Sequence, residues 1–356
     1  MVQMDSEETA MKKPRSVRPK KPAQKRRVHL ITGATSGIGI WLAKRLLERG
    51  DEVRVLLRSH PSTSESWKGV PSGVIPYVAD ITLKHHEDQK VLQDACKGID
   101  SVFHLASMTD YEKASFDDFV NINVVGTENV LKACIDTNPE DRPIRVLYIS
   151  STRVYGTKRP GEILTEESAT KPVDSYGETK LMAEQVVKSF ADAHTCIGYT
   201  IFRTSTIYGP HYEKAAFRLL KMVKEQKMRY IGGGANHLVF VHVDDVVDAF
   251  LAALDNPQAV DKTYNLSDGN AYTLRQVIDT AADSLKVPKP TKSVSPALAR
   301  LAAKMSNMSA MDMDFLMSDR VVSIGKLKKE LNFTPRHSLE SEAPTTLKEF
   351  TKYYKE

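Results

Sequence analysis

Short apolar runs and longer amphipathic stretches alternate along the chain from Val28 onward. The short runs are rich in β-branched residues and predict strands at 28–32, 53–57, 74–78, 101–105, 145–150 and 198–203. In the longer stretches apolar residues recur every three or four positions, which predicts helices at 36–49, 87–97, 117–136 and 175–193. This alternation is typical of an α/β fold with a doubly wound parallel sheet.

The alternation weakens after residue 205. The turn-rich stretches YGP and GGGAN interrupt it, and the C-terminal part combines helical patterns with prolines and a methionine cluster. We therefore expect a Rossmann domain at 28–205 with a return segment at 241–262. A smaller C-terminal lobe, at 206–240 and 263–356, is expected to bind the substrate.

Composition narrows the class of protein. With 356 residues, 41% of them apolar, the chain can bury a large core. Its longest apolar runs fall well short of the ~20 residues that cross a bilayer, so no membrane span is expected. The cysteines, Cys96, Cys134 and Cys196, fit neither a zinc site nor a disulfide framework. No metal is therefore predicted, and we expect a reducing, cytoplasmic location.

The net charge of +5 is concentrated at the N-terminus. Residues 1–27 carry nine Lys and Arg against three acidic residues, so the rest of the chain has a balance near −1. A segment this rich in Lys and Pro cannot build a core, which predicts a disordered, solubilising extension. A localisation signal or a polyanion contact is the alternative. A nucleic-acid-binding fold is not implied.

The first predicted strand runs directly into the turn TGATSGIG, residues 32–39, and then into a helix. Glycines here let the backbone approach a pyrophosphate, and the helix N-terminus offers free N–H groups and partial positive charge. An ordinary strand-to-helix turn is the alternative to this dinucleotide site. The candidate cofactor-binding residues of the turn are Gly33, Thr35, Ser36, Gly37, Ile38 and Gly39.

The end of the second strand bears on which dinucleotide binds. Leu57 and Arg58 stand where a carboxylate would accept hydrogen bonds from the adenosine ribose. Arg58 can instead pair with a 2′-phosphate, which favours NADP over NAD, although a strand-end arginine can also be merely solvated. After the third strand, Asp80 and Ile81 in VADIT are expected near the adenine.

The stretch SYGETK places Tyr176 four residues before Lys180 at a predicted helix start. Positions i and i+4 share one face of a helix, so both side chains can meet one ligand. The spacing alone is weak evidence, because Tyr155 with Arg159 and Tyr199 with Arg203 have it too. The surrounding motifs must decide.

Those motifs are TGATSGIG, VADIT, FHLAS, NINVVGTENVLKAC, YISSTRVYG, SYGETK, RTSTIYGP and FVHVDDVVDAF, in that order. From Val28 onward the chain resembles the extended branch of the short-chain dehydrogenase/reductase superfamily, the NAD-dependent epimerase/dehydratase type. One feature departs from that branch: its middle glycine usually lies one residue earlier, where this chain has Ser36.

The resemblance implies that Tyr176 is the catalytic acid/base, that Lys180 lowers its pKa and holds the cofactor ribose, and that Ser151 hydrogen-bonds the reacting oxygen. Ser150 is the nearest rival of Ser151. Further cofactor contacts are implied for Leu105 and Ala106 of FHLAS. Three remaining expectations are a cleft or core role for His104, a helix-shaping role for Asn123, and helix capping by Asp244 and Asp245.

The substrate motifs differ from two familiar patterns. Thr152 and Arg153 stand where dehydratases have an acidic pair, which disfavours water elimination. The stretch 237–240, HLVF, lacks the arginine with which nucleotide-sugar enzymes bind a diphosphate, unless Arg218, Lys221 or Arg229 replaces it. The pocket is similar instead to those of dihydroflavonol reductases and hydroxysteroid dehydrogenases. An adaptable apolar lining, or alternatively plain core, is expected from Met305, Met308, Met311, Met313 and Met317.

These expectations describe an NAD(P)-dependent oxidoreductase that moves a hydride between a nicotinamide cofactor and a secondary alcohol or ketone of a small, mainly uncharged molecule. One alternative is a nucleotide-sugar 4-epimerase with retained NAD. Another is a non-catalytic NADP-sensing regulator or scaffold, against which the intact Ser151, Tyr176 and Lys180 argue. Analogy with extended members leaves a homodimer open.

Overall fold

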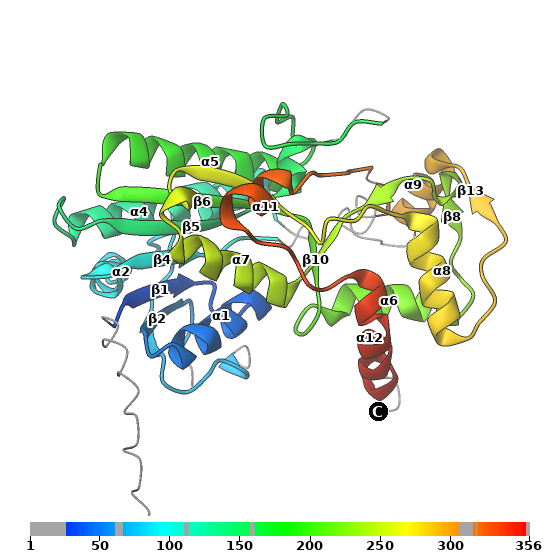
Figure 1. The fold of residues 1–356 in the computed structure, drawn as a ribbon, viewed down its shortest axis with the longest axis horizontal. Coiled ribbons are helices and arrows are strands. Elements are labelled where there is room, and N and C mark those ends of the chain that lie inside the picture. Colours follow the sequence, from blue (N-terminus) through cyan, green and yellow to red (C-terminus); the bar gives the residue numbers. More distant parts are fainter. Residues whose placement is uncertain are drawn as a thin grey trace, which may run out of the picture.

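A parallel seven-stranded sheet forms the centre of the larger lobe in the computed structural model (Figure 1), which describes residues 26–60, 67–109, 114–156, 161–305, 316–317 and 319–353. The strand order is β11-β6-β5-β4-β1-β2-β3. The six predicted strands are confirmed within a residue or so at either end. The strands are β1 (Val28–Thr32), β2 (Glu52–Leu57), β3 (Ile75–Val78), β4 (Ser101–His104), β5 (Ile144–Ser151), β6 (Ile197–Thr204) and β11 (Lys262–Leu266).

The seventh strand, β11, was not predicted. It pairs in parallel with β6, with Lys262 opposite Thr200 and Leu266 opposite Thr204. The return segment therefore continues through Leu266, beyond the expected limit at residue 262. The first 25 residues of the predicted basic tail lie outside the described residues.

Helices cover both faces of the sheet and bury most of its strands, whereas the edge strand β3 stays largely exposed. Alternate strand residues belong to two cores: Ile31 and Phe103 point into one, Leu30 and Val102 into the other. The first core lies under α1 (Gly37–Glu48) and α7 (Val243–Asp255), and α11 (Gly325–Leu331) covers β11 on the same face. The second lies under α2 (Asp88–Cys96), α4 (Gly126–Asp136) and α5 (Ser175–Ala193).

The helix predicted at 117–136 is interrupted by a π-helical turn. It consists of α3 (Phe116–Val120), the π turn η3 (Asn121–Val125) and α4. Asn123 lies in this turn and is buried. Its Oδ1 accepts hydrogen bonds from the Met108 N–H at 2.7 Å and the Ser107 hydroxyl at 3.0 Å. Its amide donates to Thr179 Oγ1 at 3.1 Å. Asn123 thus ties the loop after β4 to helix α5.

The smaller lobe packs around a third core of aromatic and aliphatic side chains from its helices and short strands. No helix in the described ranges is long and apolar enough to cross a membrane. The elements are β7 (Thr206–Tyr208), α6 (Glu213–Lys224), β8 (Tyr230–Ile231), β9 (His237–Leu238), β10 (Phe240–His242), β12 (Tyr272–Thr273), α8 (Leu274–Leu285), β13 (Ser293–Val294), α9 (Pro296–Met305) and α12 (Leu339–Tyr353).

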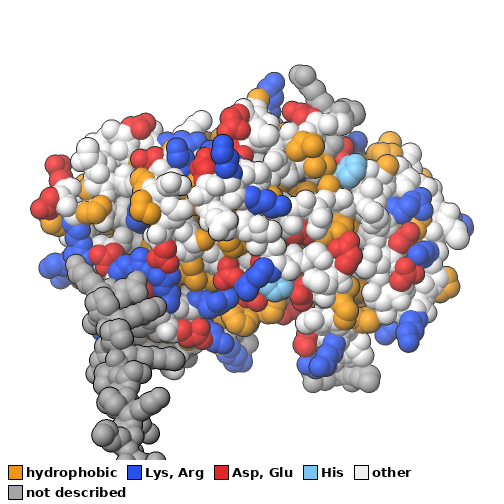
Figure 2. Space-filling model, viewed as in Figure 1, with side chains coloured by type: hydrophobic (Ala, Val, Ile, Leu, Met, Phe, Trp, Pro, Cys, Tyr) orange, Lys and Arg blue, Asp and Glu red, His pale blue; other side chains and the backbone are white. Residues whose placement is uncertain are grey.

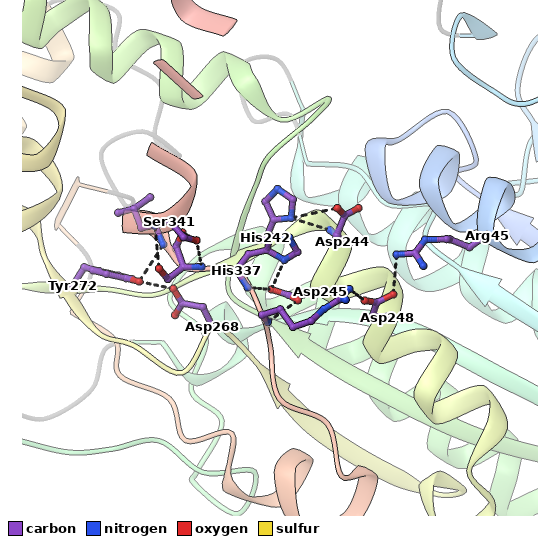
Figure 3. A network of polar contacts seen from close by, with 12 residues as sticks. Arg45, His242, Asp244, Asp245, Asp248, Asp268, Tyr272, His337 and Ser341 are labelled. Atoms are coloured by element: carbon purple, nitrogen blue, oxygen red, sulfur yellow. Dashed lines mark hydrogen bonds and ion pairs between the residues drawn. The ribbon is translucent and has the colours of Figure 1, made fainter. Parts of the chain in front are cut away.

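A polar network joins the start of α7 to the segment that leads into α12 (Figure 3). The N-cap of α7 is His242, whose ring accepts the Asp244 N–H at 3.3 Å, so the expected capping by aspartates was wrong. Asp245 instead accepts the backbone N–H groups of Arg336 and His337, at 2.9 and 3.0 Å. The carboxylate therefore holds the C-terminal segment against the sheet lobe.

The surface in view carries acidic and basic side chains intermingled, without a field of one sign (Figure 2). This matches the near-neutral balance of the chain beyond its first 27 residues. On this face there is no continuous basic patch of the kind that follows a nucleic-acid backbone.

Candidate functional site

A cleft of about 490 Å³ opens at the carboxyl ends of β1, β2, β3 and β4. This edge of a doubly wound sheet is where such folds bind their ligands. Many of the predicted cofactor residues line the cleft together. They are Gly33, Thr35, Ser36, Arg58, Asp80, Ile81, Leu105 and Ala106, joined by Trp67, Lys84, Ser107, Met108 and others.

The glycine turn after β1 packs closely against the backbone that follows β4. Gly33 has a φ of +69°, and a Cβ there would lie 2.7 Å from the Ala106 nitrogen. Ser36, which stands where the extended branch usually has glycine, is the N-cap of α1. Its Oγ accepts the Gly39 N–H at 3.2 Å and donates to the Gly33 carbonyl at 2.8 Å. The departure from the usual spacing therefore provides a helix cap.

The open end of the cleft is bordered by charged side chains at strand ends. Arg58 follows β2 and is exposed, and Lys84 is 67% exposed, with its Nζ 3.9 Å from Asp80 Oδ2. Asp80 Oδ1 accepts hydrogen bonds from the Thr82 backbone N–H and hydroxyl, at 2.9 and 2.8 Å. Asp80 therefore organises its own loop, while Arg58 and Lys84 place positive charge in reach of water and ligand.

Helix α5 carries Tyr176 in its first turn and Lys180 one turn later. The N-cap Asp174 accepts the Gly177 N–H at 2.9 Å, and Arg153 pairs with Asp174 at 2.9 Å. The Arg153 guanidinium also lies 5.8 Å from the Tyr176 ring centroid. Arg153, at the position where dehydratases have an acid, thus anchors the start of helix α5.

Lys180 is buried, with 1% of its surface exposed, and its Nζ lies 4.2 Å from the centroid of the Tyr148 ring. Burial lowers the pKa of Lys180 to about 7, although the nearby Glu184 carboxylate opposes this shift. A lysine amine with this pKa is partly protonated and partly neutral near pH 7.

The pKa of Tyr176 is raised to about 12, contrary to the expected lowering by Lys180. Burial disfavours the phenolate and outweighs the opposing effects of the Arg153 charge and of a hydrogen bond with Ser107. The phenol form of Tyr176 is therefore the stable one in the folded protein.

The two serines at the end of β5 have different surroundings. Ser150 Oγ donates to Glu184 Oε1 at 2.5 Å, and Glu184 is paired with Arg203 at 2.8 Å in the protein interior. Ser151 is the N-cap of the turn η4 (Thr152–Tyr155), where its Oγ accepts the Arg153 N–H at 3.2 Å. Ser150 thus belongs to a buried ion-pair network, and Ser151 is left at the strand end.

His104 is a satisfied core histidine. Its Nε2 lies 2.8 Å from Thr127 Oγ1, which itself donates to the Asn123 carbonyl, and its Nδ1 lies 2.7 Å from Thr32 Oγ1. This network places the proton on Nε2. Burial lowers the pKa of His104 to about 3, so the ring is neutral and its role is structural.

Several residues of the site were missed by the sequence interpretation. Ser107 hydrogen-bonds Tyr176, Tyr148 supports Lys180, and Tyr212 lies against the glycine turn. Ser107 belongs to the motif FHLAS and Tyr148 to the motif YISS, so the motifs could have pointed to both residues. No sequence pattern pointed to Tyr212, which follows YGP, because its contact depends on how the two lobes pack together.

The predicted substrate positions lie in the smaller lobe. Leu238 and Phe240 are buried in its core, whereas Arg218 and Lys221 are exposed on α6. The Arg229 guanidinium donates to the carbonyls of Gln226 and Met228. Of the methionine cluster, Met308, Met311 and Met313 lie outside the described residues, as does the side chain of Met305.

The parallel sheet, the glycine turn and the Tyr-Lys helix define an extended short-chain dehydrogenase/reductase. The chain belongs to the NAD dependent epimerase/dehydratase family, whose model matches residues 29–267. It is accordingly an NAD(P)-dependent dehydrogenase, reductase or epimerase of the extended type.

The relatives with a named activity include a reductase and an epimerase. The 2-alkyl-3-oxoalkanoate reductase of Stenotrophomonas maltophilia is 27% identical over 274 residues, which cover 75% of this chain and 78% of the reductase. UDP-glucuronate 4-epimerase 4 of Arabidopsis thaliana is 26% identical over 343 residues, which cover 91% of this chain and 74% of the epimerase. The solved structure of MoeE5 in complex with UDP-glucose and NAD is 25% identical, covers 92% of this chain and 99% of its own, and superposes with a TM-score of 0.71.

Proposed function

We propose that this protein is an NADP(H)-dependent reductase or dehydrogenase that acts on a ketone or secondary alcohol of a small, mainly uncharged molecule. The observation that carries the proposal is the apolar stretch 237–240 of the smaller lobe. Leu238, Val239 and Phe240 are buried there, where nucleotide-sugar enzymes present an arginine to a diphosphate. The named reductase among the relatives supports the same reaction class.

The cleft fits a dinucleotide. Gly33 lets the turn after β1 pack directly against the Ala106 backbone, and the first N–H groups of α1 lie at the same turn. The adenosine part is assigned to Arg58, Asp80 and Ile81. The pyrophosphate is assigned to the turn 33–39, and the nicotinamide ribose to Tyr176 and Lys180. When bound, the cofactor supplies or accepts the hydride.

Tyr176, Lys180 and Ser151 are proposed as the proton-transfer group. The raised pKa keeps Tyr176 protonated at neutral pH, which suits it to donate a proton to a ketone oxygen as that oxygen gains charge. Ser151 would hold the same oxygen through its hydroxyl. Lys180 would compensate the charge that Tyr176 acquires. In the oxidative direction Tyr176 takes the proton back.

The preference for NADP rests on Arg58 and its neighbour Lys84, which border the cleft. Both can meet a 2′-phosphate in charge-assisted hydrogen bonds. Asp80 is the acidic side chain among the described lining residues. It already accepts two hydrogen bonds from Thr82 and lies near Lys84, which reduces its repulsion of a phosphate.

The second candidate is a nucleotide-sugar 4-epimerase, which the named plant relative and the MoeE5 structure favour. The two reactions differ in how they treat the cofactor. An epimerase oxidises and re-reduces one substrate and keeps its cofactor, whereas a reductase exchanges it in every turnover. A retained dinucleotide therefore identifies the epimerase.

The experiment measures both properties in one preparation. The purified chain is denatured and the released dinucleotide is quantified. The native protein is then assayed for NADPH oxidation with ring ketones and for interconversion of UDP-sugars, with Tyr176→Phe as the inactive control. Exchangeable cofactor and turnover of an uncharged ketone support the reductase. Stoichiometric retained NAD with UDP-sugar interconversion would replace it by the epimerase.

A further inference from the structure

Tyr212 lies against the N-terminus of helix α1, next to the proposed cofactor cleft. Its hydroxyl accepts the Ile38 N–H at 3.4 Å, and Ile38 is the second residue of α1. Its ring lies so close to Gly37 that a Cβ added there would be 2.5 Å from Tyr212 Cε2. Tyr212 therefore contacts the helix N-terminus at the place assigned to the pyrophosphate.

The backbone before Tyr212 directs the side chain there. Gly209 and His211 have φ values of +107° and +70°, and the Tyr212 N–H closes the turn onto the Gly209 carbonyl at 3.0 Å. A left-handed conformation is uncommon for residues other than glycine, and it sets the direction in which the chain enters Tyr212. A Cβ at Gly209 would lie 2.4 Å from His242 Nε2, so the turn packs closely against His242.

The lining of the cleft agrees with this arrangement. Within the described part of the chain it includes Gly33, Thr35 and Ser36 and ends before Gly37 and Ile38. Tyr176 lies on the other side, close enough to Tyr212 that the second hydroxyl contributes to the raised pKa of the first, after burial and its other neighbours. The Tyr212 hydroxyl thus contacts the helix N-terminus to which the proposed function assigns the pyrophosphate.

We propose that Tyr212 is a side-chain gate of the cofactor cleft. Its hydroxyl accepts the hydrogen bond from the Ile38 N–H that a pyrophosphate oxygen would otherwise accept, and the side chain rotates away before a dinucleotide binds. The gate explains why glycine stands at position 37, since any larger side chain would meet the tyrosine ring. It also lowers the apparent affinity, because only the fraction of molecules with Tyr212 displaced can bind. This inference rests on the proposed cofactor site.

The test is stopped-flow binding of NADH, followed by quenching of Trp67, which lines the cleft. In the wild type the observed rate levels off at high NADH, because opening of the gate becomes limiting. In Tyr212→Ala the rate rises linearly and the affinity increases by about threefold to tenfold, which corresponds to one lost hydrogen bond. Adenosine, which has no phosphate, binds both proteins equally.

Two variants serve as controls. Tyr212→Phe keeps the ring over Gly37 but loses the hydroxyl, so it gives a smaller increase and guards against misfolding of the alanine variant. Tyr208→Phe removes another hydroxyl of the same segment, in the core of the smaller lobe, and leaves binding unchanged.

Three results would overturn the proposal. Weaker NADH binding by Tyr212→Ala, with adenosine unaffected, would show a direct phosphate ligand and overturn the gate. Unchanged affinity and kinetics in both Tyr212 variants would overturn it as well. A wild-type protein that binds neither adenosine, NADH nor NADPH would remove the proposed function, and the gate with it.

Discussion

Two regions of the proposed site have opposite environments. At the open cleft, where the adenosine is proposed to bind, Arg58 and Lys84 are exposed, and their charges are screened by water and salt. At helix α5, where the nicotinamide is proposed to bind, Lys180 is buried against Tyr148, and the pKa shifts of Lys180 and Tyr176 both favour the neutral form of the side chain. The exposed charges can select a cofactor, whereas burial sets the protonation states of Tyr176 and Lys180.

The largest effect is expected at helix α5. Tyr176→Phe removes the proton donor and should lower the rate of hydride transfer by about 10²- to 10⁴-fold, with cofactor affinity nearly unchanged. The measurement is single-turnover oxidation of bound NADPH. Tyr199→Phe is the matched control, because Tyr199 also precedes a basic residue by four positions. A Tyr176 variant that kept most of its activity would contradict the assigned role.

The next effect concerns stability and pH. Folding lowers the pKa of Lys180 from 10.5 to about 7, so between these values the unfolded chain binds the extra proton. The contribution of Lys180 to the free energy of unfolding is therefore lowest below about pH 7 and rises toward pH 10.5. Lys180→Met should be more stable than the wild type by about 2–4 kcal/mol at neutral pH, and the difference should shrink as pH rises.

Urea unfolding across this pH range checks the prediction. Lys132→Met, on the neighbouring helix α4 and 58% exposed, is the control and should show no such pH dependence. A constant difference between wild type and Lys180→Met would mean that the amine does not titrate with folding.

At the open cleft, Arg58→Ala should weaken NADPH binding by about 10- to 100-fold and NADH binding far less, because only NADPH carries the 2′-phosphate. Calorimetric titration of both cofactors measures the change. Arg58→Lys should keep part of the preference, and added salt should reduce it. A wild type that prefers NADH would contradict the NADP assignment but not the roles proposed for Tyr176 and Lys180.

The smallest effect is expected for Lys84→Ala. An exposed lysine contributes little through a screened contact, so NADPH affinity should fall only about twofold. The same titration resolves this. A loss as large as that of Arg58→Ala would mean that Lys84, and not Arg58, is the main phosphate ligand.

The sequence predicted the sheet better than the site. Strands such as Val28–Thr32 are largely buried and rich in aliphatic and β-branched residues, so their limits could be predicted. The strand Lys262–Leu266 was missed because its residues KTYNL resemble a loop. The π turn at Asn121–Val125 was missed because its side chains suit an α-helix equally well.

Motif order located Tyr176, Lys180 and the glycine turn, but not their surroundings. Ser107, Tyr148 and Tyr212 reach the site from three separate segments, and their contacts depend on packing across the sheet and between the lobes. The direction of the Tyr176 pKa shift also followed from burial, which spacing along a helix does not report.

The position of β11 at the edge of the sheet has a consequence for synthesis. The ribosome completes β1 to β6 by residue 204, but the strand that covers β6 emerges only with residues 262–266, and helix α11 follows at 325–331. Until β11 is available, β6 presents an unpaired edge to other chains. A nascent chain is thus exposed to edge-to-edge association from the completion of β6 until residues 262–266 have emerged.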